Sequence, residues 1–306
     1  MGFLYLLESI RTPFLDTVMM FLTRLGEETA FLAVALVFFW CIDKRKGYYI
    51  MGVGLTGTLA AQFLKLTCRV PRPWMLDPNF TIVEKARAGA YDYSFPSGHT
   101  QSAVAVFGSV AMVTKKKWLR ICCIVAAVLV PVSRMYLGVH TPLDVSVGAL
   151  ISLVLLFALR PVFLEGEGKR TTYALAGMLV LAAGYLCYAQ FWPFPADIDA
   201  GSLAGGQKNA YTLLGALLGL ILGYILDEKV THFSVKACPW VQVLKVLGGL
   251  IVTVTVMELT KKPLDALFNG HLFARLLRYT LTTFVASGLW PMTFRWFGKL
   301  RKEQEK

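Results

Sequence analysis

Long apolar segments separated by short polar or charged stretches recur along the whole chain. A helix needs about 20 apolar residues to cross the hydrocarbon core of a bilayer, and fewer when its ends snorkel to the interface. Segments that meet this condition cover residues 28–43, 48–66, 98–114, 118–135, 143–160, 172–190, 209–226, 239–258 and 276–294. The pattern predicts an all-α protein, a polytopic membrane helical bundle with about nine transmembrane helices.

Residues 1–28 precede these segments and mix apolar with charged side chains. Phe3 and Phe14, for example, share this stretch with Glu8 and Arg11. We expect it to form an amphipathic helix lying in the outer interface of the membrane. A partly buried first helix of the bundle is the alternative. A secretory signal is not expected, since neither a basic amino-terminal region nor a small-residue cleavage site is evident.

Composition fits a membrane environment. The chain is 56% hydrophobic and 16% charged, with a mean hydropathy of +0.57, values outside the range of ordinary soluble domains. Its net charge of +12 does not indicate a nucleic-acid partner, because the basic residues lie in short loops and form no continuous stripe. Anionic lipid headgroups of the bilayer are the partner that fits this charge.

Three polar blocks carry the candidate chemistry. They are Lys65 with Arg72-Pro73, Pro96-Ser97-Gly98-His99, and Ser133-Arg134 with His140 and Asp144. Transfer of a phosphoryl group requires cations on its equatorial oxygens, a nucleophile on one side and an acid on the other. The lysine and the two arginines supply fixed positive charge, and the arginines can offer bidentate forks to phosphate oxygens.

The second block predicts further phosphate contacts at the start of a helix. Ser97 offers a hydroxyl donor, and the backbone N–H of Gly98 can approach an oxyanion because glycine has no Cβ. A helix beginning at about His99 would direct its positive dipole end toward the same point.

The third block predicts an activated histidine. We expect Thr141 to cap a helix whose first residue is Pro142, with His140 just outside it. The imidazole and the Asp144 carboxylate, four residues apart, then share a face, so that the carboxylate orients the imidazole as a nucleophile. His99 is available to protonate the leaving oxygen.

The spacings Lys65-x6-Arg72-Pro73, Pro96-Ser97-Gly98-His99 and Ser133-Arg134-x5-His140-x3-Asp144 resemble the signature blocks of the type 2 phosphatidic acid phosphatase (PAP2) superfamily. The match is complete in residue type and spacing. It implies that His140 attacks phosphorus to give a phosphohistidine, that Asp144 supports it and that His99 is the acid. It also implies that no metal or other cofactor is needed. The phosphoryl group would be held by Lys65, Arg72, Ser97, Gly98 and Arg134.

Together with the pattern of apolar segments, this resemblance predicts three domains. They are an amino-terminal interfacial helix at 1–28, a PAP2-like catalytic membrane core at 29–165, and an additional carboxy-terminal transmembrane module at 166–306. The last of these carries no catalytic pattern, and the sequence leaves the oligomeric state open.

The basic residues predict an orientation. Loops retained in the cytoplasm are enriched in Lys and Arg. One predicted face carries the basic loops at 44–46, 115–120, 160–170, 229–236 and 295–306, and the three polar blocks lie on the opposite, less basic face. We therefore expect an integral protein of the cell membrane with an extracytoplasmic active site.

The favoured function is hydrolysis of a lipid phosphate or pyrophosphate. Phosphatidic acid, phosphatidylglycerol phosphate, a sphingoid phosphate and a polyprenyl (pyro)phosphate all remain open. One alternative is a sugar phosphatase of the same superfamily, and another is a transporter or non-catalytic protein that binds a phosphate headgroup. Pairing of His140 with Asp144 favours an enzyme, because binding alone needs no activated nucleophile.

Overall fold

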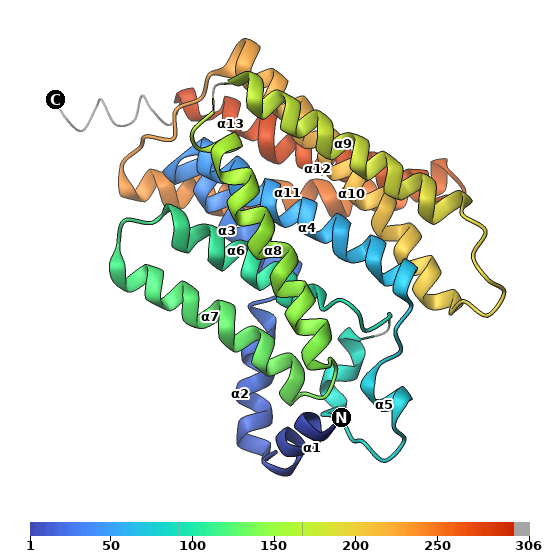
Figure 1. Ribbon diagram of the computed structural model, residues 1–306. Helices are drawn as coiled ribbons and strands as arrows, with labels where there is room; N and C mark the ends of the chain where they lie inside the picture. Colours follow the sequence, from blue (N-terminus) through green and yellow to red (C-terminus); the bar gives the residue numbers. More distant parts are fainter. Residues whose placement is uncertain (91, 167, 297–306) are drawn as a thin grey trace. The chain divides into compact units, whose positions relative to one another are not determined.

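The computed structural model describes residues 1–90, 92–166 and 168–296, and every element of regular secondary structure in these ranges is helical (Figure 1). This confirms the predicted all-α class. Four of the basic residues used to predict the orientation, Lys299, Arg301, Lys302 and Lys306, lie outside the described residues.

The first half of the chain runs through eight α-helices. In order they are α1 (Gly2–Ser9), α2 (Pro13–Arg24), α3 (Glu28–Val37), α4 (Lys44–Cys68), the short α5 (Pro73–Leu76), α6 (Gly98–Val113), α7 (Lys117–Tyr136) and α8 (Pro142–Phe163). A π-helical turn, η1 (Phe38–Ile42), continues α3, and a 3-10 helix, η2 (Glu84–Gly89), lies in the loop before α6.

The second half contains four long helices and a short one. They are α9 (Gly168–Phe191), α10 (Ala200–Leu226), α11 (Pro239–Leu267), α12 (Phe273–Phe284) and α13 (Trp290–Met292). Two further π-helical turns, η3 (Asp227–Thr231) and η4 (Val285–Leu289), continue α10 and α12.

The chain forms two compact units, each drawn from separate stretches of sequence. One comprises Met1–Ala35, Tyr49–Glu165 and Pro193–Gly206, and the other comprises Leu36–Tyr48, Gly166–Trp192 and the residues from Gln207 onward. All eight residues proposed for the site belong to the first unit. The three domains predicted from the sequence stay a prediction.

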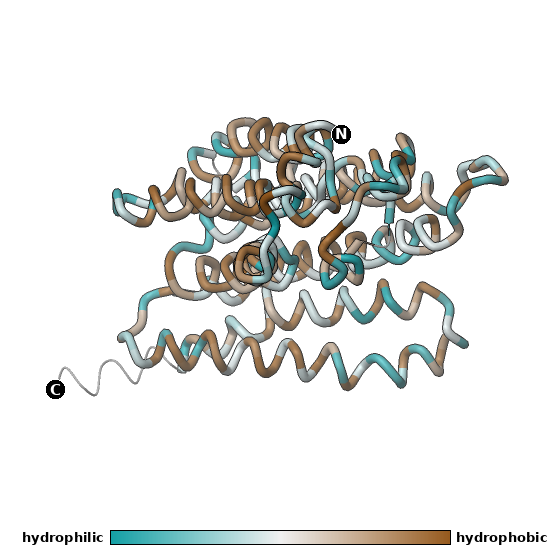
Figure 2. Tube along the Cα trace, turned by 90° about the horizontal axis from the view of Figure 1, so that it is seen from below, coloured by the Kyte–Doolittle hydropathy of each residue, from teal (hydrophilic) through white to brown (hydrophobic). Residues whose placement is uncertain are grey.

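Five described helices are long and apolar enough to cross a membrane. They are α7, α8, α9, α10 continued to Thr231, and α11; a sixth span results if α2 and the α3–η1 helix, bent by 49°, form one crossing. The predicted count of about nine is therefore not confirmed. Figure 2 shows hydrophobic residues along much of the length of the helices and hydrophilic ones in several connecting turns.

Each of the nine predicted segments nevertheless falls on a helical stretch and overruns its ends by at most two residues, although several of the helices are longer than predicted. The short ones account for part of the difference in count. Helix α6 has 16 residues; at about 1.5 Å per residue it extends about 24 Å, less than a hydrocarbon core of about 30 Å.

The amino-terminal segment forms two helices rather than the single one predicted over residues 1–28. The chain turns between α1 and α2, where the Thr12 side chain accepts a hydrogen bond from the N–H of Leu15 and Pro13 occupies the first helical position. Both helices pack against α7. Phe14 and Phe21 remain exposed, at 76% and 65%, so an interfacial position for this segment stays a prediction.

Helix α6 is the buried centre of the first unit. It packs against α7 and α8 (Figure 1), and its residues Thr100–Val106 are all buried. Close approach of α8 depends on Gly148, because a Cβ there would lie 2.6 Å from the carbonyl oxygen of Ser97. The first turns of α6 and α8 are thereby held together, and the backbone N–H of Ser97 donates to the carbonyl oxygen of Asp144 at 3.0 Å.

Candidate active site

The first turn of α8 fixes the position of His140. Thr141 caps the helix, and Pro142 is its first residue, as the sequence predicted. The Thr141 N–H donates to Oδ2 of Asp144 at 2.7 Å, and the Asp144 N–H donates to Oγ1 of Thr141 at 3.3 Å, which makes a reciprocal capping box. His140 lies just before this cap, and both His140 and Asp144 are 1% exposed.

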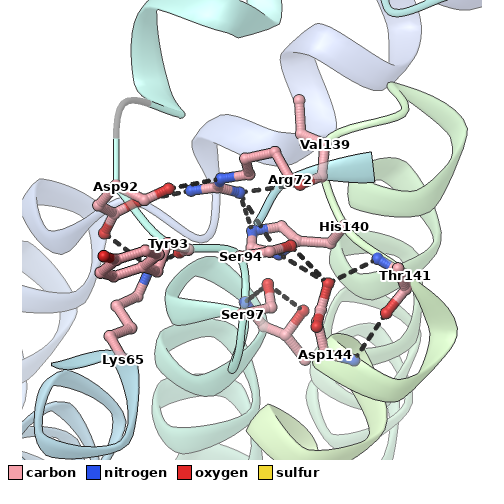
Figure 3. Close-up of polar contacts among 11 residues, drawn as sticks. Lys65, Arg72, Asp92, Tyr93, Ser94, Ser97, Val139, His140, Thr141 and Asp144 are labelled. Atoms are coloured by element: carbon pink, nitrogen blue, oxygen red, sulfur yellow. Dashed lines mark hydrogen bonds and ion pairs between the residues drawn. The ribbon is translucent and has the colours of Figure 1, made fainter. Parts of the chain in front are cut away.

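Ser94 lies between the imidazole and the carboxylate (Figure 3). Its hydroxyl donates to Oδ2 of Asp144 at 2.6 Å and lies 3.4 Å from Nδ1 of His140. The direct separation of Nδ1 from Oδ2 is 3.6 Å, an ion-pair distance beyond a hydrogen bond. Nδ1 is thus turned toward Ser94 and Asp144, and Nε2 is the ring nitrogen on the other side. Sequence reasoning missed Ser94, whose only signal was its place two residues before the second block.

The environment of His140 favours the neutral form of its imidazole. Burial lowers the pKa of His140 well below its ordinary value, and nearby positive charges lower it further. The largest of these belong to Arg72, Arg134 and Lys65. A neutral ring at neutral pH has a lone pair available for attack, which a protonated ring does not.

Asp92 binds the two cations of the first block (Figure 3). Its carboxylate lies 2.6 Å from Nζ of Lys65 and 2.5 Å from Nη2 of Arg72. Burial alone would raise the pKa of the Asp92 carboxyl, but the charges of Lys65 and Arg72 outweigh burial and hold it below its ordinary value. Asp92 is therefore an anion at neutral pH. It was not predicted, because the loop from 67 to 95 offers no local signal of which acidic residue turns inward.

The second block begins α6 as expected. Ser97 caps this helix, its oxygen accepting from the Thr100 N–H at 3.4 Å and from the Thr100 hydroxyl at 3.0 Å. These contacts leave the Ser97 proton able to donate. A Cβ added at Gly98 would meet nothing within 4 Å among the atoms that the structure describes, so there is space beside this backbone N–H. His99 lies close enough to Arg134, Lys65 and Arg72 to interact electrostatically with their positive charges.

Arg134 has donors without partners in the part of the chain that the structure describes. It is 2% exposed, and its Nη1 donates to Oγ1 of Thr23, on α2, at 2.9 Å. Its Nε and Nη2 are buried and have no hydrogen-bond partner among the residues described. Burying unpaired donors of a charged group costs free energy, so these two donors favour an anion as a partner. Thr23 was also missed, since it lies outside all three blocks.

The structure thus brings the three blocks together. Lys65, Arg72, His140 and Asp144 are joined through contacts with Asp92 and Ser94, Ser97 is bonded to the backbone of Asp144, and the Arg134 charge acts on His140. The described residues contain no cluster of three or more His, Cys, Asp or Glu side chains able to hold a metal ion. The individual catalytic roles, and independence from metal, stay predictions.

Comparison with known proteins decides the family. A model described as the PAP2 superfamily matches residues 45–166, and a second, described as the transmembrane extension of PAP2 superfamily phosphatases, matches residues 211–303. Phosphatidylglycerophosphatase B of Bacillus subtilis is 32% identical over 168 residues, which are 49% of this chain and 76% of that protein. The chain belongs to the PAP2 superfamily.

Other PAP2 relatives align with different fractions of this chain. Undecaprenyl-diphosphatase of Sulfolobus acidocaldarius is 32% identical over 140 residues, 45% of this chain and 65% of that protein. A probable sphingosine-1-phosphate phosphatase of Dictyostelium discoideum is 29% identical over 238 residues, 71% of this chain and 56% of that protein. The alignments thus span less than two thirds of these two relatives. No solved structure matches.

Proposed function

We propose that this PAP2 protein is an integral membrane phosphatase that hydrolyses a lipid phosphate or pyrophosphate through a phosphohistidine on His140. The observation that carries the proposal is a buried imidazole that is oriented through Ser94 and Asp144 and is surrounded by three buried cations, Lys65, Arg72 and Arg134. Cations alone would bind phosphate. The oriented, neutral imidazole adds a nucleophile.

The proposed reaction has two steps. Nε2 of His140 attacks phosphorus, the bond from phosphorus to the leaving oxygen breaks, and His99 transfers its proton to that oxygen. Water then attacks the phosphohistidine and gives its proton to His99, the N–P bond breaks, and inorganic phosphate leaves with His140 restored. Lys65, Arg72 and Arg134 stabilise negative charge on the equatorial oxygens in both steps, assisted by Ser97 and Gly98. Asp144 stabilises the ring when it becomes cationic.

The relatives support a lipid as substrate. Their names refer to undecaprenyl diphosphate, sphingosine 1-phosphate and phosphatidylglycerophosphate, and these share a phosphate or diphosphate on a lipid. Candidate spans α7 and α8 carry Arg134 and Asp144, so the site belongs to helices suited to a bilayer. The distribution of Lys and Arg supports a site on the extracytoplasmic face of the cell membrane.

The test is phosphate release by the purified protein in detergent with EDTA. The panel comprises phosphatidic acid, phosphatidylglycerol phosphate, sphingosine phosphate, undecaprenyl pyrophosphate and glucose phosphate. We expect release from at least one lipid in EDTA, because the proposed nucleophile is a side chain. Release confined to glucose phosphate would assign the sugar phosphatase instead. No release from any compound, with headgroup binding retained, would contradict an enzyme and favour the binding protein.

Replacing His99 with alanine is expected to slow turnover by about 10²–10⁴-fold for alkyl phosphates, the range typical of a lost general acid. Aryl phosphates have better leaving groups that depart without a proton, so their loss should be much smaller. Rates for a series of phosphate esters measure this difference. An equal loss for alkyl and aryl esters would contradict the acid role.

A further inference from the structure

Asp92 occupies a position where a phosphate oxygen is expected. Its side chain accepts from both cations of the first block, at 2.6 Å from Lys65 and 2.5 Å from Arg72. Its own carbonyl oxygen accepts from Nε of Arg72 at 2.8 Å, and the carbonyl oxygen of Tyr93 accepts from Lys65 at 2.8 Å (Figure 3). One short stretch of the loop before α6 therefore takes up the donors that the superfamily motif would give to substrate.

Nearly all the hydrogen-bond donors of Arg72 are already used by other residues of the chain. The guanidinium of Arg72 has five N–H groups. Its Nε and Nη2 each donate to Asp92, and its Nη1 donates to the carbonyl oxygen of Val139 at 2.8 Å and lies 3.0 Å from Nε2 of His140. Only one Nη2 proton has no partner in these contacts. Arg72 cannot present a bidentate fork to phosphate in this arrangement, in contrast to Arg134 with its unpartnered Nε and Nη2.

The same arrangement covers the nucleophile. Nη1 of Arg72 lies 3.0 Å from Nε2 and 3.4 Å from Nδ1 of His140, so the guanidinium lies against the imidazole ring. Phosphoryl oxygens that drew Arg72 toward themselves would move the guanidinium away from this ring. Displacement of Asp92 would therefore release the cations and expose the nucleophile in one movement.

We propose that Asp92 is an internal competitor for the phosphate site, bound to Lys65 and Arg72 until a phosphoryl group displaces it, and that it determines how tightly the site binds anions. This proposal rests on the proposed function. A phosphate monoester carries up to two negative charges and three acceptor oxygens, whereas the carboxylate carries one charge and two oxygens, so a monoester can replace it on both cations. A phosphodiester has one charge and two free oxygens and gains little by the exchange. Most headgroups in a bilayer are diesters, and the competitor keeps them from occupying the site.

The test measures binding of inorganic phosphate to the detergent-purified protein by calorimetry at neutral pH. Asp92→Asn keeps the shape of the side chain and removes its charge, and we expect it to bind phosphate about tenfold more tightly. Asp92→Glu keeps the charge and should bind no more tightly than wild type. Asp197→Asn, the same change at an exposed position, controls for loss of one negative charge.

Weaker or unchanged binding by Asp92→Asn would overturn the proposal, because a residue that merely positions Lys65 and Arg72 would not compete with phosphate. Should the asparagine variant fail to fold, difference infrared spectra of the wild type provide the second measurement. Phosphate should then shift a carboxylate band, and an unchanged spectrum at saturating phosphate would count against displacement. If neither wild type nor Asp92→Asn binds phosphate, the proposed function fails; if wild type binds and the variant gains nothing, only the competitor role fails.

Discussion

Replacing His140 with alanine is expected to reduce phosphate release by at least about 10⁴-fold, a loss comparable to that caused by removing the nucleophile of a catalytic triad. The reason is that Nε2 is the protein atom that bonds to phosphorus in the proposed mechanism. His140 lies outside α8, whose cap is made by Thr141 and Asp144, so the helix should still form. Release rates in detergent measure the effect, and circular dichroism checks the fold.

A trapping experiment tests the intermediate directly. Wild-type protein quenched during turnover of a radiolabelled substrate should carry acid-labile phosphate, and His140→Ala should carry none. His271→Ala is the matched control, because it removes a histidine of the second unit and should leave labelling unchanged. Wild-type rates in His140→Ala, or labelling that persists in it, would remove His140 from the nucleophile role.

Arg134→Lys is expected to lower turnover by about 10²–10³-fold, nearly as much as Arg134→Ala, a loss comparable to removal of an oxyanion donor. One guanidinium nitrogen donates to Thr23, while Nε and Nη2 have no partner among the described residues and can offer two separate donors to one anion. An ammonium group keeps the charge but cannot reproduce that spacing. Kinetics with the lipid substrate that the panel identifies provide the measurement.

The control for this pair is Arg87→Lys, the same change at a half-exposed arginine that pairs with Glu84 in the loop before α6. It should leave turnover within about twofold of wild type, since exposed ion pairs contribute little. If Arg134→Lys keeps most of the activity, charge alone suffices and bidentate holding by Arg134 is wrong.

The sequence predicted those parts of the site that depend on local rules. Thr141, Pro142 and Asp144 specify a helix start within four residues, and Ser97 with Gly98 does the same for α6, so both starts agree with the structure. Each apolar segment was likewise predicted to be helical from its local sequence, a run of apolar residues, and each falls on a helix in the structure. The number that cross the membrane was not obtainable in this way, because crossing depends on length and on how the ends are placed.

The residues that sequence reasoning missed are those joined over long separations. Ser94 meets Asp144 across 50 positions, Asp92 meets Lys65 across 27, and Thr23 meets Arg134 across 111. No periodicity or motif links such pairs. The prediction that both arginines offer forks could not take account of the donors of Arg72 that other residues of the chain use.

The contact between Thr23 and Arg134 bears on what counts as a minimal catalyst of this family. The PAP2 superfamily match begins at residue 45, so a fragment cut there would keep every motif residue. It would lose α2, and with it the protein partner that holds the Arg134 guanidinium in the described structure. Transplanting the motifs into another scaffold would reproduce the proposed catalytic groups but not the Thr23 hydroxyl that positions Arg134. For this chain, the proposed site therefore depends on residues outside the motif-bearing segment, including Thr23 on α2.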